Sequence, residues 1–333
     1  MKKIAYKSHY SFRKLPQNHN DFDINFFLHE VKKYIPESYI LFLKNVNVVN
    51  QNLYSLINFN FFPKYTHYPN NNVLDVFKLF IKNFINSKRS KSVIDKGVWI
   101  LDDKCNIYYH WLLDSLQRYM LLDESSKNYP VLIPKNYENK FIIEHLDYLK
   151  INYEILDEDK VFKVKNCIIP SYSAPSGNFN ENILRSLQDL FLSQKQNKDS
   201  NDSNKRIWID RVNTRREIVN KNDIEPILKK YNFQIIQTEN LTIEETINIV
   251  NESDIIAGPH GSGLANILFA NKYSTLIDIR EDDDNYRNAL FSMASALDVK
   301  YYCFAKAILD KKTEKIYLDP ILFDNFLEEI LQK

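Results

Sequence analysis

The chain has 333 residues, and 44 Lys and Arg stand against 43 Asp and Glu, which gives a formal net charge of +1. This balance excludes a strongly basic nucleic-acid arm and an acidic tail, so we expect no nucleic-acid partner. Hydrophobic residues make up 44% of the sequence, which excludes a disordered chain and is enough for a packed core. At roughly 150 residues per domain, the length predicts two domains.

The three cysteines, Cys105, Cys167 and Cys303, are too widely spaced for a disulfide framework or a Cys-x-x-Cys metal site. The basic residues at the start of the chain are not followed by the apolar stretch of a secretory signal. No apolar run approaches the roughly 20 residues of a membrane span. These features predict a soluble, cytoplasmic protein.

The first half of the chain has a mixed pattern. We expect helices at 73–85, 106–122, 139–149 and 181–192, and strands at 98–101, 131–133, 154–156 and 167–169. A polar segment, 193–205, then runs without one apolar side chain, which is typical of a solvated linker. We therefore place a domain boundary there, between a first domain at 1–195 and a second at 205–312.

The second half alternates regularly between strands and helices. The expected strands are 206–209, 233–236, 254–257, 275–279 and 300–304, and the expected helices are 222–230, 242–251, 262–270 and 285–297. This alternation is typical of a doubly wound parallel sheet, which binds ligands at the carboxyl ends of its strands. Asp319 and Pro320 then open a last helix, and its apolar stripe predicts that segment 319–333 packs back on the first domain.

Four polar residues lie at successive i+4 positions of the helix expected at 106–122: Asn106, His110, Asp114 and Arg118. Three interpretations remain open. The residues form hydrogen bonds on a solvated helix face, His110 and Asp114 bind a metal, or the stripe supports general base catalysis. In the last case either His110 or Asp114 could be the base, and His110 or Arg118 would orient Asp114.

Arg211, Arg215 and Arg216 follow the first strand of the second half. Guanidinium groups bind phosphate oxygens through forked, charge-assisted hydrogen bonds, although a solvated basic turn has the same composition. The location favours phosphate binding over a solvated turn, because this turn lies at the edge of the sheet where ligands bind.

Glycine is scarce in this chain, with five residues where average usage gives roughly twenty-three. Three of the five, Gly258, Gly261 and Gly263, fall within six residues between an expected strand and helix. Glycine permits close backbone approach and positive φ, and a helix start attracts phosphate. Together with the arginine turn at the same edge, this loop predicts a diphosphate site, with a simple turn between core elements as the alternative.

Two less specific motifs also occur in the sequence. Residues 261–266 nearly match the dinucleotide pattern G-x-G-x-x-G, and Asp278 ends the next strand, but Asn266 replaces the third glycine. The unit is also the third of its sheet rather than the first, which disfavours a dinucleotide. D-x-D-like acidic runs occur at 21–23, 157–159 and 282–284, and we interpret all three as solvated loops rather than metal sites.

Three motifs occur together in one order: N-x-x-x-H-W-x-x-D-x-L-x-R at 106–118, R-x-x-x-R-R-x-x-x-N at 211–220 and G-P-H-G-S-G-L-A-N-x-L-F at 258–269. In this combination the chain resembles the glycosyltransferase family 61 domain of capsular-polysaccharide and related transferases. The resemblance covers about residues 98–285. Ser262, Ala265 and Gln117 depart from the residues that the family often shows, which leaves the donor sugar and the acceptor open.

The resemblance implies an α/β protein with a GT-B-like fold, in which two Rossmann-type domains face each other across a cleft. It also implies an inverting transfer from a nucleotide-sugar donor, UDP-linked in our expectation, without a further cofactor or metal. The implied donor-site residues are Arg211, Arg215, His260, Gly261, Ser262, Gly263, Asn266 and Asp278, with Arg216 beside them. Arg211 and Arg215 would hold the diphosphate, and Asp278 would meet the ribose.

On the acceptor side the resemblance implies Asp114 and His110, and our mechanistic hypothesis takes Asp114 as the base. The expected acceptor is a glycan or lipid-linked glycan in surface or capsular polysaccharide synthesis. A lipid-linked acceptor would bring peripheral membrane association at the inner face of the membrane. The alternatives are an NAD(P)-dependent oxidoreductase and a non-catalytic nucleotide- or sugar-binding module on the same scaffold.

Overall fold

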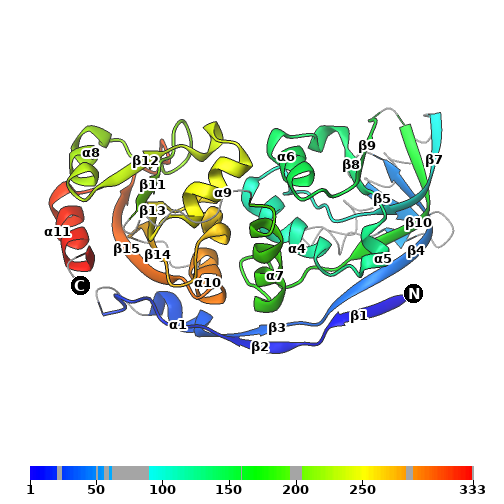
Figure 1. Cartoon of the computed structure of the whole chain (residues 1–333), viewed down its shortest axis with the longest axis horizontal. Coiled ribbons are helices and arrows are strands. Elements are labelled where there is room, and N and C mark those ends of the chain that lie inside the picture. The colour runs from blue at the N-terminus through cyan, green and yellow to red at the C-terminus, as the bar shows by residue number, and fades with distance from the viewer. Residues whose placement is uncertain are drawn as a thin grey trace. The chain divides into compact units, whose positions relative to one another are not determined.

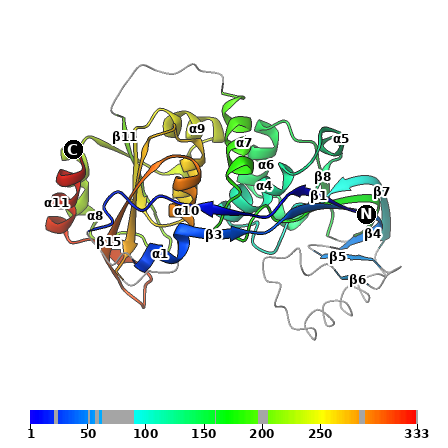
Figure 2. The same cartoon turned by 90° about the horizontal axis from the view of Figure 1, so that it is seen from below.

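A computed structural model describes residues 1–20, 25–49, 52–55, 60–61, 90–158, 160–195, 205–282 and 288–331 (Figure 1 and Figure 2). The chain forms two compact units: residues 1–9 and 35–176 make the first, and residues 10–34 and 177–333 make the second. Several expectations lie wholly or largely outside the described residues, namely the helix at 73–85, most of the polar segment 193–205 and the acidic runs at 21–23 and 282–284.

The first unit is built on an eight-stranded mixed sheet in the order β6-β5-β4-β10-β7-β8-β9, with β1 paired to β4. Its strands are β1 (Lys2–Tyr6), β4 (Ser38–Val49), β5 (Asn52–Ser55), β6 (Asn60–Phe61), β7 (Ser90–Val98), β8 (Val131–Pro134), β9 (Tyr153–Leu156) and β10 (Lys160–Pro170). The strand expected at 167–169 is the end of the longer β10, whereas the strand expected at 98–101 shares only Val98 with β7 and its other residues follow that strand. The sequence pattern missed the full length of β10 because exposed lysines alternate with buried residues along it.

Four neighbouring strands of this sheet, β10, β7, β8 and β9, are parallel. The chain runs from β7 to β8 and β9 on one side, and then returns to place β10 on the other side of β7. The connections that leave β7 and β10 therefore diverge, which makes their shared carboxyl edge a topological switch point. The helix expected at 106–122 begins from this edge.

The second unit contains a six-stranded sheet in the order β12-β11-β13-β14-β15-β16. Its strands are β11 (Arg206–Ile209), β12 (Phe233–Ile236), β13 (Ile255–Pro259), β14 (Thr275–Glu281), β15 (Lys300–Leu309) and β16 (Ile316–Tyr317). The first five are parallel and β16 is antiparallel to β15, so the expected parallel sheet is confirmed. The switch point lies between β11 and β13, because the chain turns to opposite sides of β11.

Helices flank both faces of this sheet (Figure 1). They are α7 (Glu181–Leu192), α8 (Lys221–Lys230), α9 (Ile243–Asn251), α10 (Ala289–Ala296) and α11 (Pro320–Leu331), with the 3-10 helix η6 (Ser262–Phe269) after β13 and the short 3-10 helix η5 (Thr238–Asn240) after β12. A capping box opens α9, with Thr242 and Glu245 each bonding the other's backbone. The segment expected as a helix at 262–270 forms tighter 3-10 turns, in which Leu264 N–H donates to the Gly261 carbonyl.

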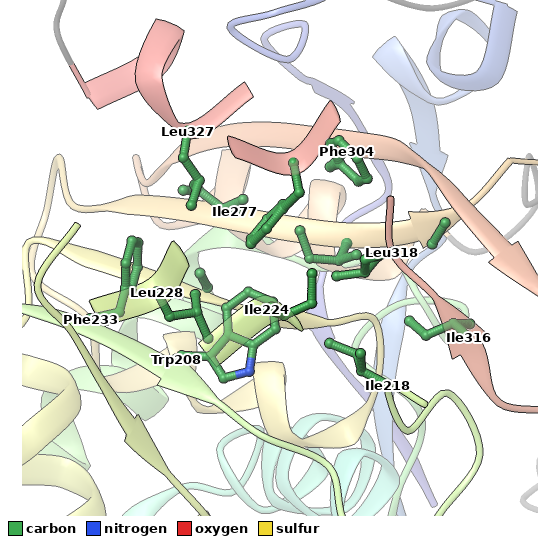
Figure 3. Packing of buried hydrophobic residues seen from close by; sticks show 14 residues of the cluster. Trp208, Ile218, Ile224, Leu228, Phe233, Ile277, Phe304, Ile316, Leu318 and Leu327 are labelled. Atoms are coloured by element: carbon green, nitrogen blue, oxygen red, sulfur yellow. The ribbon is translucent and has the colours of Figure 1, made fainter. Parts of the chain in front are cut away.

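The last helix, α11, packs within the second unit rather than on the first domain, which corrects our expectation. Phe323 and Leu327 are fully buried in one core with residues of α8 and the sheet, and Figure 3 shows Leu327 beside this cluster. The ring of Phe323 lies 5.8 Å from that of Trp208 in β11. The sequence showed only that one face of α11 is apolar. It did not show that this face packs against α8.

The N-terminal segment of residues 10–34 instead joins the second unit. It contains β2 (His9–Phe12), helix α1 (Asn25–Val31) and β3 (Lys32–Ile35), and β2 pairs with β3. Asn18 exchanges two hydrogen bonds with the backbone of Cys303, and the buried ring of Phe27 lies 4.7 Å from that of Phe291 in α10. Figure 1 and Figure 2 both show α1 beside α10.

Helix α7 also belongs to the second unit, so the division of the chain differs from a boundary at 193–205. Its Phe191 packs against Phe269 of η6 with ring centroids 5.0 Å apart, and Gln188 donates to the Ala270 carbonyl. A polar segment in the sequence marks where the chain is solvated. It does not show that the preceding helix, α7, already packs in the core of the second unit.

Candidate functional site

The helix that carries the first motif is continuous over 108–119 but changes its winding. It consists of α3 (Tyr108–His110), a π-helical turn η3 (Trp111–Ser115) and α4 (Leu116–Tyr119). Leu116 N–H donates to the Trp111 carbonyl five residues earlier. Such π-turns occur frequently at functional sites. Because the extra residue of this turn rotates α4 about the helix axis, the four predicted polar residues no longer form one stripe.

His110 and Asp114 form a hydrogen-bonded pair at the start of this helix. His110 Nδ1 lies 2.7 Å from Asp114 Oδ2, and the two side chains are 16% and 5% exposed. Ser176, in the loop after β10, donates to the same carboxylate oxygen at 3.0 Å. The pair therefore lies at the carboxyl edge of β7 and β10, the switch point of the first unit. An ionised carboxylate only accepts hydrogen bonds, so Nδ1 carries the proton.

Arg118 does not contact Asp114, contrary to one of our interpretations. Its guanidinium is fully buried and donates to the carbonyls of Pro170, Ile100, Leu101 and Trp99 at 2.8–3.4 Å. Three of these carbonyls follow the end of β7, and the fourth belongs to Pro170, the last residue of β10. Arg118 therefore links the segment after β7 to the end of β10.

Asn106 precedes the helix and is exposed, and its side-chain oxygen accepts from Asn139 at 2.8 Å. It therefore stands apart from the His110–Asp114 pair. Of the four residues on the predicted stripe, the structure brings only the central two into contact.

The arginine turn and the glycine loop meet at the switch point of the second unit. A Cβ atom at Gly261 would lie 1.8 Å from Arg211 Nη1, so the guanidinium of Arg211 rests against this glycine. Arg211 Nε also donates to the Arg215 carbonyl at 2.9 Å, which holds the side chain in place. The expectation that these two loops share one edge is confirmed.

The structure also shows why this loop contains glycines. A Cβ atom at Gly258 would lie 2.5 Å from the Ile209 carbonyl oxygen, and one at Gly263 would lie 3.0 Å from the Ile209 side chain. Gly261 has φ 162°, which is extended backbone, so positive φ is not the reason for glycine there. All three glycines make room for the end of β11 or for Arg211, which follows it by two residues.

The other two arginines of the turn engage acidic groups. Arg215 is exposed and pairs with Glu314 at 2.9 Å. Arg216 has a positive φ of 62°, and its Nε lies 3.8 Å from the buried carboxylate of Glu281. Arg211 is therefore the arginine of this turn that lies directly against the glycine loop.

His260 and Asp278 form a second histidine–aspartate pair. His260 Nδ1 lies 2.9 Å from Asp278 Oδ2, and the Tyr301 hydroxyl donates to the same oxygen at 2.7 Å. Burial alone would raise the pKa of Asp278, but His260, Arg280 and Tyr301 stabilise its charge and hold that pKa below its ordinary value. Asp278 is 0% exposed, so the ribose contact that we expected is incompatible with this geometry, and Asp278 instead supports His260.

Asn266 is fully buried too, and its amide donates to the Gly263 carbonyl at 2.8 Å, which stabilises the loop from inside. Gly261, Ser262 and Gly263 remain partly exposed. These three residues and Arg211 therefore form the accessible part of this edge, while Asn266 and Asp278 are buried behind them.

Sequence reasoning missed two partners of the histidine–aspartate pairs, Ser176 and Tyr301. Ser176 follows β10, and Tyr301 lies on β15 next to β14. The only sequence signal for Ser176 was its position after a predicted strand. The only one for Tyr301 was its position within a predicted strand. Neither residue belongs to a motif, because the contact depends on which strands become neighbours.

Two searches over the described ranges concern metals and membranes. No group of three or more His, Cys, Asp or Glu side chains gathers there as a metal ion would require. Among the helices of the same ranges, none has both the length and the apolar character of a membrane span.

The two switch points, each with a histidine–aspartate pair, define an α/β protein with Rossmann-like parallel sheets. The family model described as Glycosyltransferase 61 matches residues 108–277, more than half of the chain. The chain therefore belongs to glycosyltransferase family 61 and is a glycosyltransferase, as its motifs predicted. A search of curated proteins finds no match to this sequence.

The loop glycines give a test that separates folding from binding. We expect Gly258→Ala to destabilise the second unit by about 1–3 kcal/mol, because the new methyl group meets a backbone oxygen that cannot move away. Gly261→Ala meets only the mobile end of Arg211, so we expect near-normal stability but roughly tenfold weaker binding of UDP. Urea unfolding and titration calorimetry measure the two effects, and equal destabilisation by both variants would contradict this assignment.

Proposed function

We propose that this protein is an inverting glycosyltransferase that moves a sugar from a nucleotide-sugar donor to a glycan acceptor in surface or capsular polysaccharide synthesis. The observation that carries the proposal is the guanidinium of Arg211 against Gly261, at the switch point of the parallel sheet. Ligands of such sheets bind at this point, and a donor diphosphate needs both a cation and close backbone approach there.

Arg211 is suited to stabilise the leaving group. Burial lowers the pKa of Arg211 and the neighbouring Glu239 opposes this shift, yet a guanidinium remains protonated throughout the physiological range. Its hydrogen bond to the Arg215 carbonyl fixes it before the donor arrives. A preorganised cation stabilises negative charge that grows on the leaving phosphate without reorganisation during the reaction.

We further propose that the base is His110, with Asp114 as its positioning residue, which revises our first hypothesis. Asp114 already accepts hydrogen bonds from His110 Nδ1 and Ser176, so Nε2 is the ring nitrogen that takes the acceptor proton. The acceptor oxygen then bonds to the anomeric carbon, while the bond from this carbon to the diphosphate oxygen breaks. The electron pair leaves with the diphosphate, and Asp114 stabilises the imidazolium that forms.

The two alternatives from the sequence have less support. The NAD(P) interpretation needs an accessible carboxylate at Asp278 to hold a ribose, and this carboxylate is buried against His260. A non-catalytic binding module would have no use for the hydrogen-bonded and partly exposed His110–Asp114 pair. With a lipid-linked acceptor, the proposed reaction would take place at the cytoplasmic face of a membrane.

The donor site is tested by nucleotide binding. A thermal-shift panel of UDP-, GDP- and CMP-sugars against NAD(P) should show stabilisation by a sugar nucleotide, with UDP compounds expected first. Arg211→Ala should then weaken binding of the matching nucleoside diphosphate about 10- to 100-fold in titration calorimetry. Arg185→Ala, which removes an arginine paired with Asp298 elsewhere in the unit, is the control. Unchanged affinity in Arg211→Ala would refute the phosphate assignment.

The base is tested by two variants whose ranking depends on which residue takes the proton. His110→Gln retains a donor toward Asp114 but has no basic nitrogen, so turnover should fall at least about 100-fold. Asp114→Asn should cost less, because the base remains and only the carboxylate that positions it is lost. Donor affinity should be unchanged in both, and His29→Ala, an exposed histidine, should behave like wild type. The reverse ranking would make Asp114 the base.

The proposal also assigns the charge of the leaving diphosphate to Arg211 and the backbone of the glycine loop, without a divalent cation. Transfer activity should therefore persist in excess EDTA, measured as release of nucleoside diphosphate. Activity that is lost in EDTA and restored only by Mn²⁺ or Mg²⁺ would overturn the metal-independent mechanism and leave the family assignment intact.

A further inference from the structure

The two-stranded sheet of β2 and β3 presents three aromatic side chains and a lysine on one face. Tyr10, Phe12 and Tyr34 are 55%, 70% and 52% exposed, and Lys32 is exposed among them. Alternation along the two strands puts all four side chains on the same face. We call these four residues the aromatic patch. Exposed aromatic clusters of this kind are uncommon on soluble proteins and mark contact surfaces.

The opposite face of the same sheet is firmly anchored. Ser11 donates to Glu181, and the buried guanidinium of Arg13 donates to Glu30 and Asn178 at 2.7 Å. The patch is therefore held in a fixed orientation by the core of the second unit, and its exposed aromatic side chains need no large rearrangement before they meet a partner.

The arrangement within the patch indicates the chemistry of that partner. The Lys32 ammonium lies 4.8 Å from the centroid of the Tyr10 ring and 5.7 Å from that of Phe12. Among the described residues, Lys32 has no carboxylate partner. The patch therefore combines apolar rings with one cation whose charge is not neutralised, which complements an anionic surface with an apolar layer beneath it.

Sugar stacking fits the same residues poorly. The Tyr10 and Tyr34 rings meet edge to face, with an interplanar angle of 61°, so they do not form the flat platform on which a pyranose ring would lie. The ammonium of Lys32 also covers part of the ring faces. Tyrosine and phenylalanine at headgroup depth, with lysine at the phosphates, match a lipid surface better.

We propose that the aromatic patch is a docking surface for a bilayer that contains anionic lipids. The rings enter the headgroup region and Lys32 pairs with lipid phosphate. This surface goes beyond the sugar-transfer chemistry, since binding to a vesicle requires neither donor nor acceptor. A failure of the membrane-docking proposal can therefore be distinguished from a failure of the proposed glycosyltransferase function.

The test is co-sedimentation of the full chain with vesicles of pure phosphatidylcholine and of phosphatidylcholine with 30% phosphatidylglycerol. We expect binding to the anionic vesicles that decreases in 0.5 M NaCl. The double variant Tyr10→Ser/Phe12→Ser should bind at least about tenfold more weakly, and Lys32→Glu at least about fivefold more weakly.

Tyr273→Ser is the matched control, because Tyr273 is 63% exposed and Lys272 lies 5.0 Å from its ring centroid, away from β2 and β3 in the sequence. Lys311→Glu controls for net charge, and unchanged thermal midpoints show that the variants are folded. Binding that is absent, or equal in patch and control variants, would overturn the proposal. A dimer that depends on the patch in light scattering would do the same, because it would identify a second copy as the partner.

Discussion

The close approach of β11 to the loop after β13 is the constraint on which the proposed donor site of the second unit depends. The Ile209 carbonyl, the Ile209 side chain and the Arg211 guanidinium lie where side chains at 258, 263 and 261 would project. At 258 a side chain would meet a backbone oxygen, whereas at 263 and 261 it would meet only the side chains of Ile209 and Arg211. The result is a cation placed directly against an exposed stretch of backbone, at the edge of the sheet where parallel α/β proteins bind their ligands.

The same topological feature organises the first unit. There the diverging connections belong to β7 and β10, and Arg118 links the segment after β7 to the end of β10 through four carbonyl groups. His110 and Asp114 begin the helix that leaves this edge, and Ser176 reaches them from the neighbouring connection. The π-turn between His110 and Leu116 lets the pair face this edge while Arg118 turns into the core.

The two histidine–aspartate pairs differ in their surroundings, and this difference matches the separate roles that we propose for them. The pair in the first unit is partly exposed, as the proposed proton transfer to His110 requires. In the second unit the buried carboxylate of Asp278 is hydrogen-bonded to His260 and Tyr301 through the same oxygen, and Arg280 stabilises its charge. A buried carboxylate of this kind fixes the orientation of a histidine and leaves only the histidine to meet a ligand.

The sequence by itself determined the parallel sheet of the second unit, the family and the location of the arginine and glycine loops. These features depend on local periodicity, capping residues and scarce glycines, all of which act over a few neighbouring residues. Only the tertiary structure decided that Arg118 and Asp278 are buried supports and that α11 packs on α8. It also decided that residues 10–34 join the second unit. Those outcomes depend on which apolar faces and strand edges meet, and the spacing of residues along a chain does not contain that information.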